Sequence, residues 1–184
     1  MKKNLFYLFM VCLFLAGCGD GTTNNSTVED KVDGQIKKET KEEQKNEEYE
    51  LKQIGETFKL EDWEVALESF EFNQTISRDT MSSKAGEGNK FLILNFKVVN
   101  NGTEANQLMN QNDGITLKAV YNDKYTYNES LTLIDGDLHH ENVRPLSSLE
   151  GFVVVEMPDN VVEATESIKL YLEKEDSKVQ INIR

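Results

Sequence analysis

The residues best suited to chemistry lie in one short stretch of the chain. Its only two histidines, His139 and His140, are closely flanked by three carboxylates, Asp135, Asp137 and Glu141. Imidazole and carboxylate groups are ligands for transition metals such as Zn²⁺. Adjacent side chains of an extended chain point to opposite faces, however, so the two histidines suit one metal ion poorly. We therefore expect neither a metal nor a cofactor, and we interpret these residues as a polar loop that can contact a partner.

Nucleophilic catalysis has little support in the chain. The hydroxyl groups nearest to the histidines belong to Ser147 and Ser148, and a catalytic triad also needs a placed third member and an oxyanion hole. The chain contains no G-x-S-x-G motif, no H-E-x-x-H motif and no phosphate-binding P-loop. We therefore expect a protein that is not an enzyme. A hydrolytic or metal-dependent enzyme on the same scaffold is the alternative.

Cys18 is the second chemically distinctive residue. It follows a basic start (MKK), an apolar run over residues 5–15 and the residues Leu15, Ala16 and Gly17, a layout that is typical of a secretory signal. The apolar run is shorter than the about 20 residues of a transmembrane helix. The tetrapeptide LAGC resembles the lipobox of bacterial lipoprotein precursors. The resemblance implies cleavage between Gly17 and Cys18, a diacylglycerol on the Cys18 thiol, and a lipid anchor on the extracytoplasmic face of the cell membrane.

Composition restricts the partners of the chain. Its formal net charge is −13, whereas a nucleic-acid binder needs clustered Lys and Arg to neutralise phosphates, so we expect no nucleic acid. An anionic lipid surface would repel the chain, and membrane attachment is therefore expected to depend on the acyl chains of Cys18. The other cysteine, Cys12, lies in the segment that cleavage would remove, so the mature chain is expected to form no disulfide.

The composition changes sharply near residue 51. Residues 18–50 are rich in Asn, Thr, Ser, Gly, Lys and Glu and contain few apolar residues. Such a segment cannot bury enough apolar surface to offset the entropy of ordering it. We predict a signal peptide over residues 1–17, a lipidated cysteine and flexible linker over 18–50, and one folded domain over 51–184, which is an ordinary domain length.

The predicted domain alternates with the period of two that is expected for strands with one buried face. In residues 90–99 one face is wholly apolar and the other includes polar side chains, namely Leu92, Leu94, Phe96 and Val98 against Asn95 and Lys97. Similar or weaker patterns predict strands over residues 54–60, 115–121, 149–157, 167–173 and 178–184. Turns are predicted around 100–102, 121–125 and 174–176. Residues 61–72 fit a strand with a bulge near Glu68, and a short helix is the alternative.

The domain also resembles a known family. The stretches that carry the resemblance are IGETFKLEDWEVALESFEF, GNKFLILNFKVVNNGTE, LEGFVVVEMPDN and IKLYLE. They resemble a bacterial family described as telokin-like or immunoglobulin-like, which is common in Gram-positive lipoproteins. The resemblance implies an all-β, immunoglobulin-like sandwich of about seven or eight strands, a fold that the spacing of short strands also favours. It carries over no active site.

Two segments, 73–89 and 129–148, exceed ordinary loop lengths, and segments of this kind often bind partners. The second contains the histidines and four apolar residues, Leu131, Leu133, Ile134 and Leu138, so part of it is expected to pack. We interpret the chain as a membrane-anchored extracytoplasmic lipoprotein that presents a non-catalytic sandwich to an unknown protein or ligand. A passive spacer or stress protein of the cell envelope is the further alternative.

Overall fold

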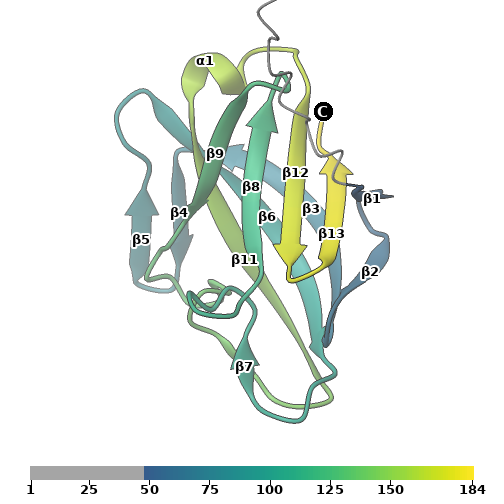
Figure 1. Cartoon of the computed structure of the whole chain (residues 1–184). Coiled ribbons are helices and arrows are strands. Elements are labelled where there is room, and N and C mark those ends of the chain that lie inside the picture. Colours follow the sequence, from purple (N-terminus) through teal and green to yellow (C-terminus); the bar gives the residue numbers. More distant parts are fainter. Residues whose placement is uncertain (1–47) are drawn as a thin grey trace, which may run out of the picture. The chain divides into compact units, whose positions relative to one another are not determined.

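Nine strands form one hydrogen-bonded ladder in residues 48–184, the part of the chain that the computed structural model describes (Figure 1). In ladder order they are β1 (Glu50–Lys52), β13 (Ser177–Asn182), β12 (Ile168–Lys174), β8 (Thr116–Tyr121), β9 (Tyr125–Ser130), β11 (Ser147–Pro158), β6 (Asn89–Asn100), β3 (Trp63–Asn73) and β2 (Thr57–Leu60). Two short pairs join β4 (Thr75–Arg78) to β5 (Met81–Lys84) and β7 (Asn106–Gln107) to β10 (Asn142–Val143). The helix of this part, α1 (Asp159–Val162), is far too short to cross a lipid bilayer. The predicted signal peptide, the Gly17–Cys18 cleavage site and the linker up to residue 47 lie outside the described residues.

The ladder folds over at β9 to give two layers. The first part of β9 pairs with β8, and its last two residues, Glu129 and Ser130, pair with β11. A strand that passes from one sheet to the other in this way closes one side of a sandwich. One layer contains β1, β13, β12 and β8, and the other contains β11, β6, β3 and β2 (Figure 1). The structure thus confirms the predicted all-β, immunoglobulin-like sandwich.

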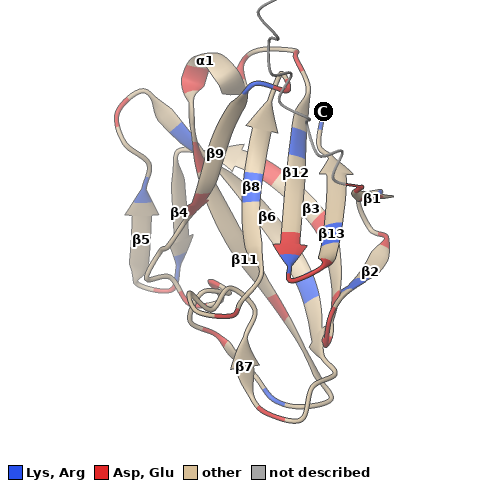
Figure 2. Cartoon of the chain, in the orientation of Figure 1, with Lys and Arg blue, Asp and Glu red and all other residues tan. Residues whose placement is uncertain are grey.

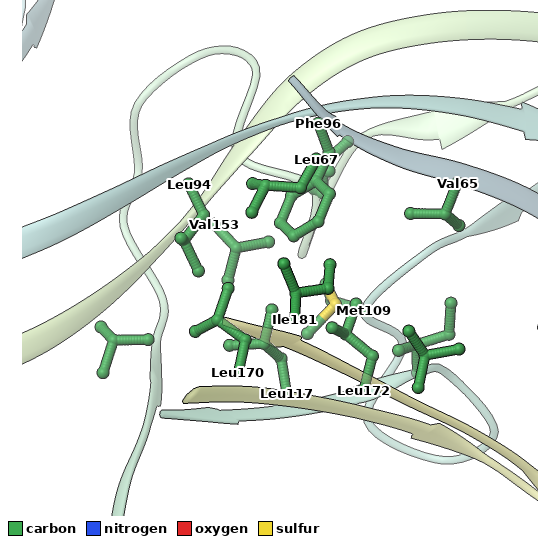
Figure 3. Packing of buried hydrophobic residues seen from close by; sticks show 14 of the residues in the cluster. Val65, Leu67, Leu94, Phe96, Met109, Leu117, Val153, Leu170, Leu172 and Ile181 are labelled. Atoms are coloured by element: carbon green, nitrogen blue, oxygen red, sulfur yellow. The ribbon is translucent and has the colours of Figure 1, made fainter. Parts of the chain in front are cut away.

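The main core fills the space between these layers. Figure 3 shows side chains of β3, β6 and β11 facing side chains of β8, β12 and β13, with Leu94, Phe96 and Val153 on one side and Leu170 and Ile181 on the other. The predicted inward set of the central strand is confirmed, because Leu92, Leu94, Phe96 and Val98 are all buried. The turns at 121–125 and 174–176 also lie where they were expected, between β8 and β9 and between β12 and β13.

The ambiguous segment 61–72 is a strand, with the bulge where the sequence predicted it. The register of β3 against β6 shifts between Leu67 and Ser69, which leaves Glu68 as the extra residue. A bulge moves the following side chains to the other face of a strand. For this reason Leu67 and, beyond the bulge, Phe70 and Phe72 all pack against the same core. The helical alternative is wrong.

A second apolar cluster lies on the outer face of β6 and β11. Its members are Phe91 and Ile93 of β6, Phe152 and Val154 of β11, and three residues that cover them from outside, Ile76, Ala85 and Ile134. The sequence predicted that the central strand, β6, buries only one of its faces. This prediction is wrong for the first half of β6, where side chains on both faces are buried. The prediction that 73–89 is an irregular loop is also wrong, because this segment contains the β4–β5 hairpin that supplies Ile76 and Ala85 to the cover.

Candidate functional site

The predicted loop is organised around one buried carboxylate, Asp137, whose side chain is 0% exposed. Its Oδ2 accepts hydrogen bonds from the backbone N–H and the hydroxyl of Thr132, both at 2.7 Å. Its Oδ1 accepts from the backbone N–H of His139 at 3.1 Å and from His139 Nδ1 at 2.6 Å. Because a carboxylate oxygen can only accept, Nδ1 is the ring nitrogen of His139 that carries the proton. Asp137 therefore links the two ends of the loop at residues 132–139. We call this set of four hydrogen bonds the Asp137 staple.

The four donors also explain the charge state of Asp137. Burial in the loop raises the pKa of this carboxyl, and the hydrogen bonds from His139 and Thr132 lower it by more. The net result is a pKa below the usual range of an aspartate, so the group is ionised near neutral pH. A carboxylate that is fully buried and accepts four hydrogen bonds from its own loop has no lone pair aimed at solvent for a ligand.

The loop lies directly on β11 because a glycine allows close contact. Phe152 N donates to Gly136 O at 2.8 Å, and Leu138 N donates to Phe152 O at 3.0 Å. A Cβ atom at Gly151 would come within 2.5 Å of Leu138 Cδ2 and 2.7 Å of Gly136 O. Gly151 is thus required by the packing of the loop on the strand, since any side chain there would push the loop away.

The structure divides the predicted site residues into two groups. Asp137 and His139 form the buried pair described above, and Glu141 accepts a hydrogen bond from the backbone N–H of Gly136 at 2.9 Å. Asp135 and His140 are exposed. Within residues 48–184 no three His, Cys, Asp or Glu side chains converge in a geometry that could hold a metal ion. The hydroxyl of Ser147, which the sequence does not favour as a nucleophile, donates to the carbonyl of Pro145 at 3.3 Å.

The β4–β5 hairpin meets the loop side by side. The Arg78 guanidinium lies 5.0 Å from the centroid of the Phe152 ring, which is buried beneath the cover. Gly136 is next to the same guanidinium and has a φ of +89°, a left-handed conformation that glycine adopts without strain. A side chain at this position would collide with Arg78. The hairpin and the loop therefore form one continuous outer layer over β6 and β11.

This outer layer leaves large apolar side chains in solvent. Leu131 is 57% exposed, Leu133 is 72% exposed, and Met81 at the start of β5 is 45% exposed. Of the four apolar residues that were expected to order the loop, Ile134 and Leu138 are buried, whereas Leu131 and Leu133 are exposed. The alternation of Leu131 and Leu133 with Thr132 and Ile134 could have indicated this division from the sequence. We call Met81, Leu131 and Leu133 the outer apolar surface.

A second feature, which the sequence patterns did not predict, is an open cleft of about 560 Å³ at one end of the sandwich. Acidic residues line it from four separate segments, with Asp62 on the β2–β3 turn, Glu104 after β6, Asp113 before β8 and Glu175 on the β12–β13 turn. Figure 2 shows acidic residues on the two turns. Lys174, the one basic residue among those that line the cleft, donates to the backbone carbonyl of Asp113.

An aromatic contact holds the residue just before β1 against the sandwich. The ring of Tyr49 packs edge-on against Tyr171 with centroids 4.8 Å apart, and its hydroxyl donates to Glu173 at 2.6 Å. Lys118 donates to the same carboxylate at 2.7 Å. Burial raises the pKa of Glu173, and the bonds from Lys118 and Tyr49 lower it to a net value below normal. The contact fixes the start of β1 on the outer face of the β13–β12–β8 layer, which is the layer opposite the outer apolar surface.

Comparison with known proteins agrees with the fold. The family model DUF4352, described as a domain of unknown function, matches residues 52–173. No curated protein matches the chain. An uncharacterized β-sandwich protein from Clostridium difficile 630 superposes with a TM-score of 0.61 at 18% identity, over 76% of this chain and 99% of that one. The yjhA protein from Bacillus subtilis gives a TM-score of 0.49 at 12% identity, over 72% of this chain and 98% of that one. The first likeness supports the β-sandwich and no more than the fold.

Proposed function

The chain belongs to the DUF4352 family, a domain of unknown function, and on that premise we propose that it is a membrane-anchored extracytoplasmic lipoprotein whose sandwich binds a protein or ligand partner. The anchor is the diacylglycerol that the lipobox resemblance implies for Cys18. The binding site is the outer layer built from the β4–β5 hairpin and the 129–148 segment. The domain acts by presenting this layer and catalyses no reaction.

One observation carries the binding proposal. Large apolar side chains stand in solvent on a loop that the rest of the molecule holds firmly, since Asp137, Gly151 and the contact with Arg78 all fix its backbone. Leu131 and Leu133 are two residues apart on an alternately buried segment and so face the same side, and apolar side chains that share an exposed face form the kind of surface that partners bind. A loop that is already ordered also loses little entropy when a partner binds.

The attachment geometry supports the same proposal. Tyr49 holds the start of the domain on the outer face of one layer, and the outer apolar surface lies on the outer face of the other layer. The described chain therefore begins, beside Tyr49, on the face opposite the outer apolar surface and does not cover that surface.

The anchoring half of the proposal is tested with Cys18→Ser. We expect loss of fatty-acid labelling, together with an unprocessed chain or release into the medium. A Cys18→Ser protein that is processed normally and retained in the membrane would contradict the lipid anchor.

The binding half is tested in intact cells by a photo-reactive amino acid placed at Leu133. The matched control carries the same amino acid at Leu51, which is also an exposed leucine (63%) but lies on β1. We expect discrete cross-linked adducts at position 133 that do not form at position 51. Adducts that are equal at both positions, or absent at 133, would favour the passive spacer and refute a binding role for the outer layer.

A further inference from the structure

Three acidic residues lie at or next to the contact between the hairpin and the loop. Asp79 follows Arg78 at the tip of the hairpin and is exposed, and Asp135 precedes Gly136 on the loop and is exposed as well. Glu141 lies beside them, because its carboxylate accepts the hydrogen bond from the backbone N–H of Gly136. Arg78 lies against Gly136, so Asp79 and Asp135 each adjoin one side of this contact along the chain, and Glu141 is bonded to it.

The cation at this contact, Arg78, is already engaged within the domain. The Arg78 guanidinium lies over the Phe152 ring, an arrangement in which the ring attracts the positive charge. The carboxylates of Asp79, Asp135 and Glu141 outnumber it, so the flank of the outer apolar surface carries a net negative charge. Met81 pairs directly with Arg78 across the hairpin, and Leu133 is only three residues from Gly136. Apolar and acidic groups therefore meet on the same part of the outer layer.

We propose that the outer apolar surface docks a partner segment in which apolar side chains are flanked by lysine or arginine. This inference rests on the proposed binding function and names the chemistry of the partner for the same surface. Complementary charge speeds the encounter and rejects partners of the wrong sign, while burial of Leu131 and Leu133 supplies the contact energy. The alternatives fit less well, because an anionic lipid surface or a second copy of this acidic chain would meet like charge.

The test uses the full chain held in a non-ionic amphipol, with protein-free amphipol as the blank. The probes are three synthetic peptides of one length, namely a helical leucine–lysine peptide, its counterpart with glutamate for lysine, and its counterpart with serine for leucine. Binding is measured by interferometry at low and at physiological ionic strength. The leucine–lysine peptide is expected to bind, and each of the other two to bind at least about tenfold more weakly.

Two sets of variants locate the binding. Leu131→Ser with Leu133→Ser removes the apolar contact, and Asp79→Asn with Asp135→Asn and Glu141→Gln removes the acidic flank. Each set is expected to weaken binding of the leucine–lysine peptide by about tenfold. The altered side chains are exposed or retain an oxygen acceptor, so the thermal midpoint should stay near that of the unaltered protein, and this is measured alongside.

The matched control neutralises the same number of charges in the end cleft, through Asp62→Asn, Glu104→Gln and Glu175→Gln. This set leaves the net charge equal to that of the acidic-flank set. The proposal is overturned if the cleft set weakens binding as much as the flank set, if the glutamate peptide binds as well as the lysine peptide, or if no peptide binds. Cross-linking at Leu133 distinguishes the two levels of inference. Adducts whose mapped contact on the partner lacks Lys and Arg would refute the proposed partner chemistry but would agree with the binding function. The absence of adducts would refute both.

Discussion

Replacing Asp137 with asparagine tests whether the buried carboxylate holds the outer layer together. The two side chains have the same shape, but an amide offers one acceptor oxygen and one donor nitrogen in place of two acceptors. Whichever way the amide is turned, its nitrogen meets two donors. On one side they are the backbone N–H and hydroxyl of Thr132, and on the other they are the backbone N–H and Nδ1 of His139. At least one buried backbone N–H is left without an acceptor.

The cost follows from those contacts. A hydrogen bond to a charged group contributes about 1.5–3 kcal/mol, and an unpaired buried donor costs about 1–3 kcal/mol. Thr132 can rotate its hydroxyl to accept from the new amide, which recovers part of the loss. We expect Asp137→Asn to lower the free energy of unfolding by about 3 kcal/mol, which corresponds to a fall of about 10 °C in the thermal midpoint for a domain of this size.

The assay is thermal unfolding followed by circular dichroism, combined with hydrogen exchange of the amides in residues 131–139. Asp135→Asn is the control, because it makes the same chemical change two residues away at an exposed position and should cost less than about 0.5 kcal/mol. The pKa of Asp137 is lowered in the folded state, so its contribution is fully present above the unfolded pKa of about 3.9 and is lost as the pH falls through the folded value. The difference between the native protein and Asp137→Asn should therefore shrink below about pH 4. Equal thermal midpoints for Asp137→Asn and Asp135→Asn near neutral pH would refute the stabilising role of the Asp137 hydrogen bonds.

Four further variants probe the parts that position the site. Leu94→Ala should cost about 2–5 kcal/mol in chemical denaturation, whereas Lys97→Ala should cost less than about 1 kcal/mol, and equal costs would show that the face assignment of β6 is wrong. Gly151→Ala should speed hydrogen exchange across the loop, because its methyl group overlaps Leu138, and unchanged exchange would argue against the close contact. Tyr49→Phe keeps the ring and removes the hydroxyl bond, so the β1 amides should exchange faster while the global midpoint changes by less than about 3 °C.

The sandwich itself could be predicted because its inner faces follow simple alternation. Leu92, Leu94 and Phe96 repeat with a period of two, and the turns carry residues that favour them, such as Asn122 with a φ of +51° between β8 and β9. The bulge at Glu68 could also be predicted, because Phe70 and Phe72 do not continue the alternation of apolar residues that precedes Glu68.

The second core was harder to predict, although one signal was present. The runs FLIL in β6 and FVVV in β11 are apolar without interruption, which is typical of strands buried on both faces. The elements that cover them gave no such signal. The β4–β5 hairpin brings only Ile76 from its strands to the cluster and is otherwise rich in Ser and Thr, so its pattern resembles that of a loop.

The sequence indicated where the polar loop lies but not how its side chains are arranged. The stretch with both histidines does form the organised loop, yet the partner of Asp137 on its far side is Thr132, a residue with no distinctive pattern. The contacts that fix the loop join it to β11 and to the hairpin, and such long-range contacts depend on the completed fold. Spacing along the chain cannot indicate them.

The register of the loop is the strongest argument that its outward leucines have a purpose. The loop needs only to cover Phe152 and Val154, and a shift by one residue would turn Leu131 and Leu133 inward for that task. The staple prevents this shift, because Asp137 bonds both the backbone and the side chain of Thr132 and so fixes which residues face the core. The chain thus uses a fully buried charge to hold two leucines largely in water. A loop selected only for stability would bury them, whereas a loop selected to hold a partner would show them as this one does.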